Sequence, residues 1–332
     1  MRLTGCANSK KTSKLKNKKY GEMKTGQHFP LSTLHSSFTS LHTHTLFCDG
    51  KDDVETMCRT AFEKGLVAIG FSGHAPVGKT GFVTDWHIKD ERLGEYIDEV
   101  KAARLRWEGR LDVYLGLEID YIKGLHSAMD GDIQKLGLDY AIGSVHYLIP
   151  PHGAPFTIDG PVEEVDKGIA EGYGGDGEAM MNAYWDAVLE MIALGGFDIV
   201  GHVDLVKKNN TGIDGNPGRL FDREKETYTK RTEEIARAIS ASGLLTEVNT
   251  GGINRGKFTE TCPSLKILQQ LRQYSAPVVV TADAHKAGDL DGNYQIACQT
   301  LLDAGYTEHT LFFGRKNGKP ARHIVNLENN VS

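Results

Sequence analysis

The sequence is short of cysteine, and its cysteines are not paired at a metal-binding spacing. Its 332 residues include five cysteines, an odd number, and no Cys-x-x-Cys pair. Neither a disulfide framework nor a thiolate zinc site is therefore favoured, and a reducing compartment such as the cytoplasm is expected. The chain also lacks the run of about 18 apolar residues by which a membrane-spanning helix is recognised.

An excess of basic charge is also missing. The chain has 38 Lys and Arg against 44 Asp and Glu, a formal net charge of -6, and no basic stripe outside its first twenty residues. Nucleic acid is therefore not the expected partner. A small anionic substrate is compatible with this balance if bound metal ions supply positive charge locally. No feature of the sequence predicts an oligomeric state.

The first residues are polar and rich in lysine. The run from Lys10 to Lys19 is too polar to bury, which predicts a disordered tail over residues 1–36 and one folded domain over residues 37–332. Residues 3–6 resemble the end of a bacterial lipoprotein signal, yet no apolar segment stands ahead of them. A lipoprotein anchored through Cys6 is the alternative, and it predicts an apolar segment encoded upstream of Met1.

Short apolar, β-branched runs alternate with longer stretches of helical period along the rest of the chain. This alternation is typical of βα units around a parallel sheet. No Gly-x-Gly-x-x-Gly follows any strand, and polar residues occur at nearly every strand end, so seven or eight such units favour a barrel over an open sheet. The expected strands are 37–41, 67–71, 112–117, 140–143, 199–203, 244–249, 278–281 and 310–313, and the expected helices are 53–64, 90–106, 184–194, 223–242, 264–273 and 294–304.

The segment 149–180 interrupts this rhythm. It is dense in glycine and proline, which predicts a long loop that could cover the mouth of the barrel.

Potential metal ligands follow six of the expected strands. His42 and His44 end the first strand, where alternation along an extended chain points both imidazoles to the same side. In a barrel the six strand ends converge, and imidazole and carboxylate are ligands that zinc, manganese and iron accept. Nine candidates are more than one ion can use, so two or three ions with Glu118 as a bridge are expected. The nine are His42, His44, Asp49, His74, Glu118, His146, His202, Asp283 and His285.

The alternative for any one histidine is a hydrogen-bonded structural role, which is the commoner fate of a single buried imidazole. It is the expectation for the seven histidines that follow no predicted strand. Of these, His87 and His152 lie in segments that could cover the substrate. Asp120, two residues after Glu118, is expected to lie just outside the ligands.

Six motifs occur in an order that resembles a known family, the polymerase-and-histidinol-phosphatase (PHP) family, and in particular its monofunctional histidinol-phosphatase branch. The resemblance covers about residues 38–313. It implies a distorted (β/α)7 barrel with three divalent ions, for which zinc, iron and manganese are all suitable. The motifs are His42-Thr43-His44, Phe71-Ser72-Gly73-His74, Gly116-Leu117-Glu118-Ile119-Asp120-Tyr121, Gly143-Ser144-Val145-His146, Gly201-His202-Val203-Asp204-Leu205-Val206-Lys207 and Asp283-Ala284-His285.

The resemblance also implies how the ligands are shared. His42, His44, Glu118 and Asp283 would hold the first ion; Glu118, His146 and His202 the second; Asp49, His74 and His285 the third.

The activity implied is hydrolysis of L-histidinol phosphate to L-histidinol and phosphate, a step of histidine biosynthesis. No cysteine or aspartate lies in a signature for a phosphorylated enzyme, so hydroxide formed from metal-bound water is the expected nucleophile. Arg255 is expected to grip the phosphate from a loop at the rim. Asp204 is expected either to protonate the leaving group or to orient His202. The alternative is a family member that acts on other phosphomonoesters or on nucleotides.

Overall fold

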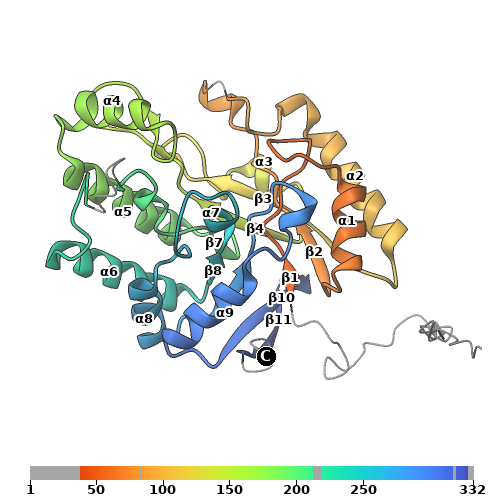
Figure 1. The fold of residues 1–332 in the computed structure, drawn as a ribbon. Helices are drawn as coiled ribbons and strands as arrows, with labels where there is room; N and C mark the ends of the chain where they lie inside the picture. Colours follow the sequence, from red (N-terminus) through yellow and green to blue (C-terminus); the bar gives the residue numbers. More distant parts are fainter. Residues whose placement is uncertain (1–37, 83, 212–217, 317–318, 328–332) are drawn as a thin grey trace, which may run out of the picture. The chain divides into compact units, whose positions relative to one another are not determined.

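Seven parallel strands form a nearly closed barrel in the computed structural model, which describes residues 38–82, 84–211, 218–316 and 319–327 (Figure 1). The residues that follow the first and the last strand of the barrel are joined by two backbone hydrogen bonds. His44 N donates to Ala284 O and Ala284 N donates to His42 O, both at 2.9 Å. The expected seven-stranded barrel is therefore confirmed. In spatial order its strands are β1 (Thr39–Ser40), β2 (Ala68–Phe71), β3 (Asp112–Asp120), β4 (Tyr140–Ser144), β7 (Ile199–Val200), β8 (Leu245–Asn249) and β9 (Val278–Thr281).

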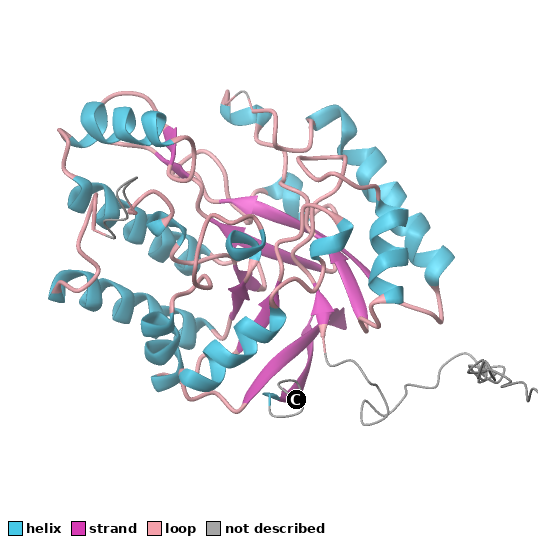
Figure 2. Ribbon diagram, in the orientation of Figure 1, coloured by secondary structure: helices cyan, strands magenta, loops and turns pink. Residues whose placement is uncertain are grey.

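Helices pack around the outside of these strands (Figure 2). Their ends follow ordinary capping rules: the Asp53 side chain accepts from Thr56 N at 2.7 Å at the start of α1, and Gly195 ends α5. The helices are α1 (Val54–Glu63), α2 (Leu93–Trp107), α3 (Gly131–Gln134), α4 (Val162–Tyr173), α5 (Gly177–Leu194), α6 (Glu226–Ser242), α7 (Gly251–Asn254), α8 (Leu265–Gln273) and α9 (Tyr294–Asp303), with 3-10 turns at Gly78–Thr80, Asp90–Arg92, Leu205–Lys207 and Ala287–Asp289.

Apolar side chains fill the inside of the barrel. Tyr140 lies across it and donates a hydrogen bond to Leu41 O. Two glycines make room for this ring, because a Cβ on Gly70 or Gly116 would lie 2.5 Å from Tyr140 atoms. Leu41, Tyr140, Ile142, Ile199, Leu245, Val279 and Phe312 form this inner cluster.

The expected eighth strand is not part of the barrel. It belongs to β10 (Glu308–Lys316), which pairs antiparallel with β11 (Lys319–Asn326). Phe312 of β10 is fully buried, and its ring meets that of Tyr140 edge-on with centroids 5.9 Å apart. The hairpin therefore contributes an apolar plug to the barrel interior, which explains why its sequence has the pattern of a barrel strand.

The segment 149–180 is not the long loop that its composition predicts. It contains β6 (Phe156–Thr157), which pairs with β5 (Tyr147–Leu148), then α4 and the start of α5. Two of its glycines, Gly168 and Gly172, serve close packing instead of turns. A Cβ on Gly168 of α4 would lie 2.4 Å from the Phe156 ring, and one on Gly172 would lie 2.5 Å from Pro150.

The expected tail, residues 1–36, and the alternative anchor Cys6 lie outside the described residues, so the domain boundary at residue 37 stays a prediction. Across the described ranges, no helix combines the length and the apolar character that a bilayer crossing requires.

Candidate metal centre

Glu118 lies at the centre of the ligands that the strand ends bring together. It is fully buried on β3. Its Oε2 atom lies 3.1 Å from His42 Nε2 and 3.0 Å from His74 Nδ1, while Oε1 lies 2.9 Å from His202 Nε2 and 3.8 Å from His146 Nε2. One carboxylate thus faces imidazoles from four strand ends, which is the geometry expected of a bridging ligand.

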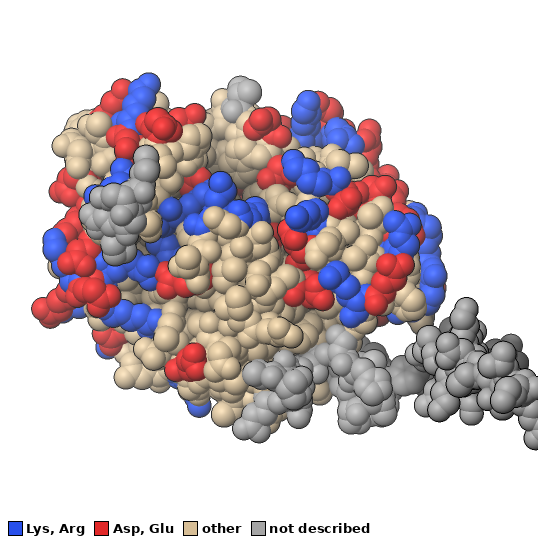
Figure 3. Space-filling view, in the orientation of Figure 1, with Lys and Arg blue, Asp and Glu red and all other residues tan. Residues whose placement is uncertain are grey.

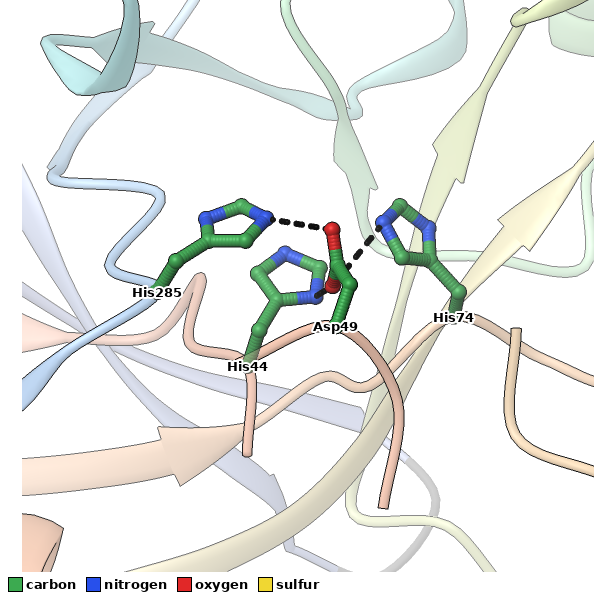
Figure 4. A group of neighbouring side chains, drawn as sticks. All are labelled: His44, Asp49, His74 and His285. Carbon is green, nitrogen blue, oxygen red and sulfur yellow. Dashed lines mark hydrogen bonds and ion pairs between the residues drawn. The ribbon is translucent and has the colours of Figure 1, made fainter. Parts of the chain in front are cut away.

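A second group gathers around Asp49 (Figure 4). Its Oδ2 atom lies 3.0 Å from His285 Nε2, and its Oδ1 atom lies 3.6 Å from His44 Nδ1 and 3.9 Å from His74 Nε2. The turn that brings Asp49 back over the barrel depends on Gly50. A Cβ there would lie 2.4 Å from Thr45 N, so no larger residue fits.

Asp283 completes the set from the end of β9 in a strained conformation. Its φ is +46°, a left-handed value that costs free energy in a residue with a Cβ. The conformation aims Oδ1 at His44 Nε2, 3.3 Å away, and at His42 Nε2, 3.8 Å away. Gly251 accommodates it, because a Cβ on Gly251 would lie 2.6 Å from Asp283 Cβ.

The donor atoms fit metal ions. Within the described residues, His42 Nε2, His44 Nε2, His74 Nδ1 and Glu118 Oε2 are buried and make no hydrogen bond, although they face one another. An unsatisfied buried polar atom costs about 1–3 kcal/mol, so several at one point indicate a missing partner. Potential ligand atoms lie within 4.8 Å of one another in the groups His44, Asp49, His74, His285; His42, His44, Glu118; His42, His202, Asp283; and Glu118, His146, His202.

Charge and burial oppose each other at these residues. Burial lowers the pKa of His42, but the carboxylates of Glu247 and Glu118 outweigh burial and raise that pKa well above 6.5. Burial also lowers the pKa of His146, but the carboxylate of Asp120 outweighs burial and raises that pKa to about 10. Without ions, these imidazoles therefore hold protons at neutral pH, and ions must displace them.

His44 behaves differently. Its burial and the neighbouring His285 and His74 lower its pKa to about 3, so that it is neutral and ready to coordinate at neutral pH.

Asp120 lies beside the candidate ligands, and its carboxylate is close enough to His74 and His146 for these three residues to form a further group that could hold an ion, so its expected place outside the ligands stays a prediction. Its Oδ1 atom accepts from His146 Nδ1 at 2.7 Å, and its Oδ2 atom lies 2.9 Å from His87 Nε2. His87 in turn contacts Thr84 Oγ1 through Nδ1, at 2.7 Å. Of the two histidines in segments that could cover the substrate, His87 thus contacts the site through Asp120, whereas His152 is exposed on the surface.

Arg255 lies at the rim as expected. Its Nη2 atom donates to Asp283 Oδ2 and its Nη1 atom to Asp283 O, both at 2.9 Å. Nη1 also lies 2.9 Å from His285 Nδ1. The guanidinium therefore fixes two candidate ligands while it lines the pocket.

Asp204 departs from both expected roles. Its buried Oδ2 atom accepts from Lys207 Nζ and from Ser264 N, each at 2.9 Å. Among the described residues no contact joins it to the ring of His202, and it does not line the pocket. β7 ends at Val200 and the chain then turns, so Asp204 does not follow His202 along an extended strand.

Glu247 is the residue that the search of strand ends missed. It is fully buried in the middle of β8, and its Oε2 atom lies 2.8 Å from His42 Nδ1. A glutamate in the middle of a predicted strand was the available signal, because a charge that is buried there needs a partner.

The centre lies at the bottom of a pocket of about 1020 Å³. One wall is aromatic, with Phe82 and Trp86 stacked on Tyr147 at centroid distances of 5.0 and 5.6 Å. Asp159 and Glu164 add carboxylates to the lining. Basic side chains gather in the hollow near α7 (Figure 3), and Lys208, Arg255 and Lys257 are among the lining residues.

A family model described as "PHP domain" matches residues 40–251, more than half of the chain. The chain belongs to the PHP domain family. The match confirms the resemblance inferred from the six motifs. It covers all the candidate ligands except Asp283 and His285.

Two curated relatives of this PHP domain protein match at moderate identity. A probable histidinol-phosphatase of Deinococcus radiodurans is 29% identical over 265 residues, which cover 80% of this chain and 92% of the relative. A histidinol-phosphatase of Bacillus subtilis is 27% identical over 272 residues, which cover 76% and 96%.

Solved structures share the fold of this PHP domain protein. A putative histidinol phosphatase from Listeria monocytogenes superposes with a TM-score of 0.68 at 24% identity, covering 77% of this chain and 98% of that one. Histidinol phosphate phosphatase from Lactococcus lactis, in complex with zinc, L-histidinol and phosphate, gives a TM-score of 0.61 at 20% identity, covering 86% and 98%.

Proposed function

We propose that this PHP domain protein is a metal-dependent phosphatase that hydrolyses L-histidinol phosphate to L-histidinol and phosphate. The observation that carries the proposal is the convergence of nine imidazole and carboxylate side chains at the bottom of one pocket whose rim carries Arg255. The choice of histidinol phosphate is supported by the two curated relatives, which are named for this activity and align over most of their length.

The proposal includes three ions, with the ligands divided as the sequence resemblance implies. The division is supported by the separate groups around Glu118 and around Asp49. Asp283 stands close to His42 and His44 in support of a shared first ion. When bound, the ions would activate water for attack on phosphorus and neutralise the phosphoryl oxygens.

The protein's own side chains would bind and orient the substrate. Arg255 and Lys208 line the pocket beside the centre and supply positive charge for the phosphoryl group. The stacked wall of Phe82, Trp86 and Tyr147 offers aromatic faces to an imidazole ring, and Asp159 and Glu164 offer carboxylates to an ammonium group. A phosphorylated amino alcohol with an aromatic ring has all three of these features.

The proposed substrate is a small molecule and not a nucleic acid. The net charge of -6 and the acidic side chains of the pocket would repel a polyanion. We place the enzyme in the cytoplasm, since the four cysteines that the structure describes are all free.

The experiment that tests the proposal compares kcat/KM for L-histidinol phosphate with kcat/KM for a panel of phosphomonoesters, a nucleotide and an oligonucleotide. We expect a preference of at least about 100-fold for histidinol phosphate, as a site that pairs buried polar groups with the substrate can provide. A flat profile would leave a general phosphoesterase. A preference for the nucleotide or oligonucleotide would support the alternative function.

A further inference from the structure

The two ring nitrogens of His42 face different carboxylates. Nε2 points into the metal centre, 3.1 Å from Glu118 Oε2 and 3.8 Å from Asp283 Oδ1. Nδ1 points the other way, 2.8 Å from Glu247 Oε2. Because a carboxylate accepts but does not donate, the contact with Glu247 places a hydrogen on Nδ1, and Nε2 is left as the nitrogen that can bind an ion once the ion displaces the proton held there beside Glu118.

Glu247 lies outside the ligand set. Among the described residues, none of the groups of converging potential ligand atoms includes it. Its carboxylate oxygens instead accept hydrogen bonds from four donors. Besides His42, Thr281 Oγ1 donates to Oε2 at 2.8 Å, Asn249 Nδ2 donates to Oε1 at 2.9 Å, and His202 N donates to Oε1.

These contacts reach residues assigned to different ions. His42 belongs to the proposed first ion, and the backbone of His202 carries a ligand of the second. Asn249 Nδ2 lies 3.3 Å from Asp283 Oδ2 as well, so the network includes a second ligand of the first ion. Glu247 thus supports from outside the two positions that Glu118 joins from inside.

We propose that Glu247 is a positioning residue that locks His42 in the tautomer with Nε2 free and holds the first and second ion positions in register. The inference rests on the proposed metal centre and extends it, because it names a buried carboxylate that binds neither ion nor substrate. Carboxylate partners of metal-bound histidines commonly contribute 10 to 100-fold to ion affinity, and Glu247 is expected to do the same.

The test uses Glu247→Gln and, as a matched control, Thr281→Val. Glutamine keeps the size of the side chain, but its amide can donate to His42 Nδ1 and so favour the tautomer with the hydrogen on Nε2. Thr281→Val removes another contact of the same carboxylate and leaves that with His42. Zinc affinity is measured by competition with a chromophoric chelator, and bound zinc is counted by mass spectrometry.

We expect Glu247→Gln to weaken the binding of one zinc equivalent by about 10 to 100-fold and Thr281→Val to change it by less than about 3-fold. Wild-type affinity in Glu247→Gln, or an equal loss in both variants, would overturn the inference. The readout is bound zinc, so failure to hydrolyse histidinol phosphate would count against the proposed function and not against the role of Glu247.

A measurement on the wild-type enzyme tests the same inference even if the Glu247→Gln variant does not fold. Nitrogen NMR of the zinc-loaded protein should find His42 with a protonated Nδ1 and a metal-bound Nε2. A metal-bound or unprotonated Nδ1 would contradict the proposal directly.

Discussion

Arg255 donates from Nη2 to Asp283 Oδ2 at 2.9 Å, while Oδ1 of the same carboxylate faces the imidazoles of the metal centre. The guanidinium thus holds a candidate ligand, Asp283, in its strained conformation and also presents positive charge to the pocket. Both depend on the planar, forked geometry of arginine, which lysine lacks.

Arg255→Lys is therefore expected to lower kcat/KM by about 100-fold, as the loss of one charge-stabilising donor typically does. Steady-state kinetics with zinc counted in the same samples will check this. Lys257→Ala is the matched control, since it removes a basic side chain from the same pocket lining without a contact to Asp283 among the described residues. An equal loss in the control would mean that only the general charge of the pocket matters.

Removal of the ions should abolish turnover, and loss of the central carboxylate should prevent its recovery. Glu118→Gln removes the only negative charge of the side chain that would bridge two ions, so the variant should bind at least one fewer zinc equivalent after dialysis. Ion counting and activity after chelation and reconstitution with zinc, manganese or iron are the measurements. Full activity of the chelated wild-type enzyme would contradict the metal mechanism.

The pH dependence of stability should include a contribution from His309, a histidine that belongs to none of the candidate ligand groups in the described residues. His309 of β10 is 2% exposed, and within the described residues neither of its nitrogens has a hydrogen-bond partner. Burial lowers its pKa from 6.5 to about 4. Between about pH 6.5 and about pH 4, His309 is therefore protonated in the unfolded chain but neutral in the folded chain. The free energy of unfolding consequently falls as pH decreases from about 6.5 to about 4, by about 3 kcal/mol in all.

His309→Phe should remove this component, because phenylalanine keeps an aromatic ring without a titrating nitrogen. The free energy of unfolding, measured with urea at pH 7 and at pH 4.5, should differ less between the two pH values in the variant than in the wild type. His323→Gln, at an exposed position on the paired strand β11, should leave the difference unchanged.

Asp204 should be important for stability and not as an acid. Asp204→Asn leaves Lys207 buried with a weakened partner, and breaking a buried pair typically costs about 3–5 kcal/mol. Denaturant unfolding should show the loss, while the shape of the kcat profile against pH should match that of the wild type. If the fall of kcat at high pH were absent in the variant, Asp204 would instead be the proton donor to the leaving group.

Sequence reasoning predicted the barrel and the ligand candidates because both depend on local pattern. The end of a strand such as Leu41-His42 can be read from its neighbours, and parallel strand ends must converge. It failed where packing between distant segments decides. Gly168 and Gly172 look like loop residues until Phe156 and Pro150 are found against them. Glu247 looks misplaced until His42, 205 residues away, is found beside it.

The apolar plug formed by Tyr140 and Phe312 has a consequence for turnover. Because apolar side chains fill the inside of the barrel beneath the candidate metal centre, the proposed substrate would enter and the products would leave through the same opening of the pocket. Inorganic phosphate left behind would occupy the place that the next phosphate ester needs. In the proposed reaction, phosphate that leaves through the same opening would compete with the incoming ester, so inorganic phosphate would act as a competitive inhibitor and its release would be a candidate for the slowest step.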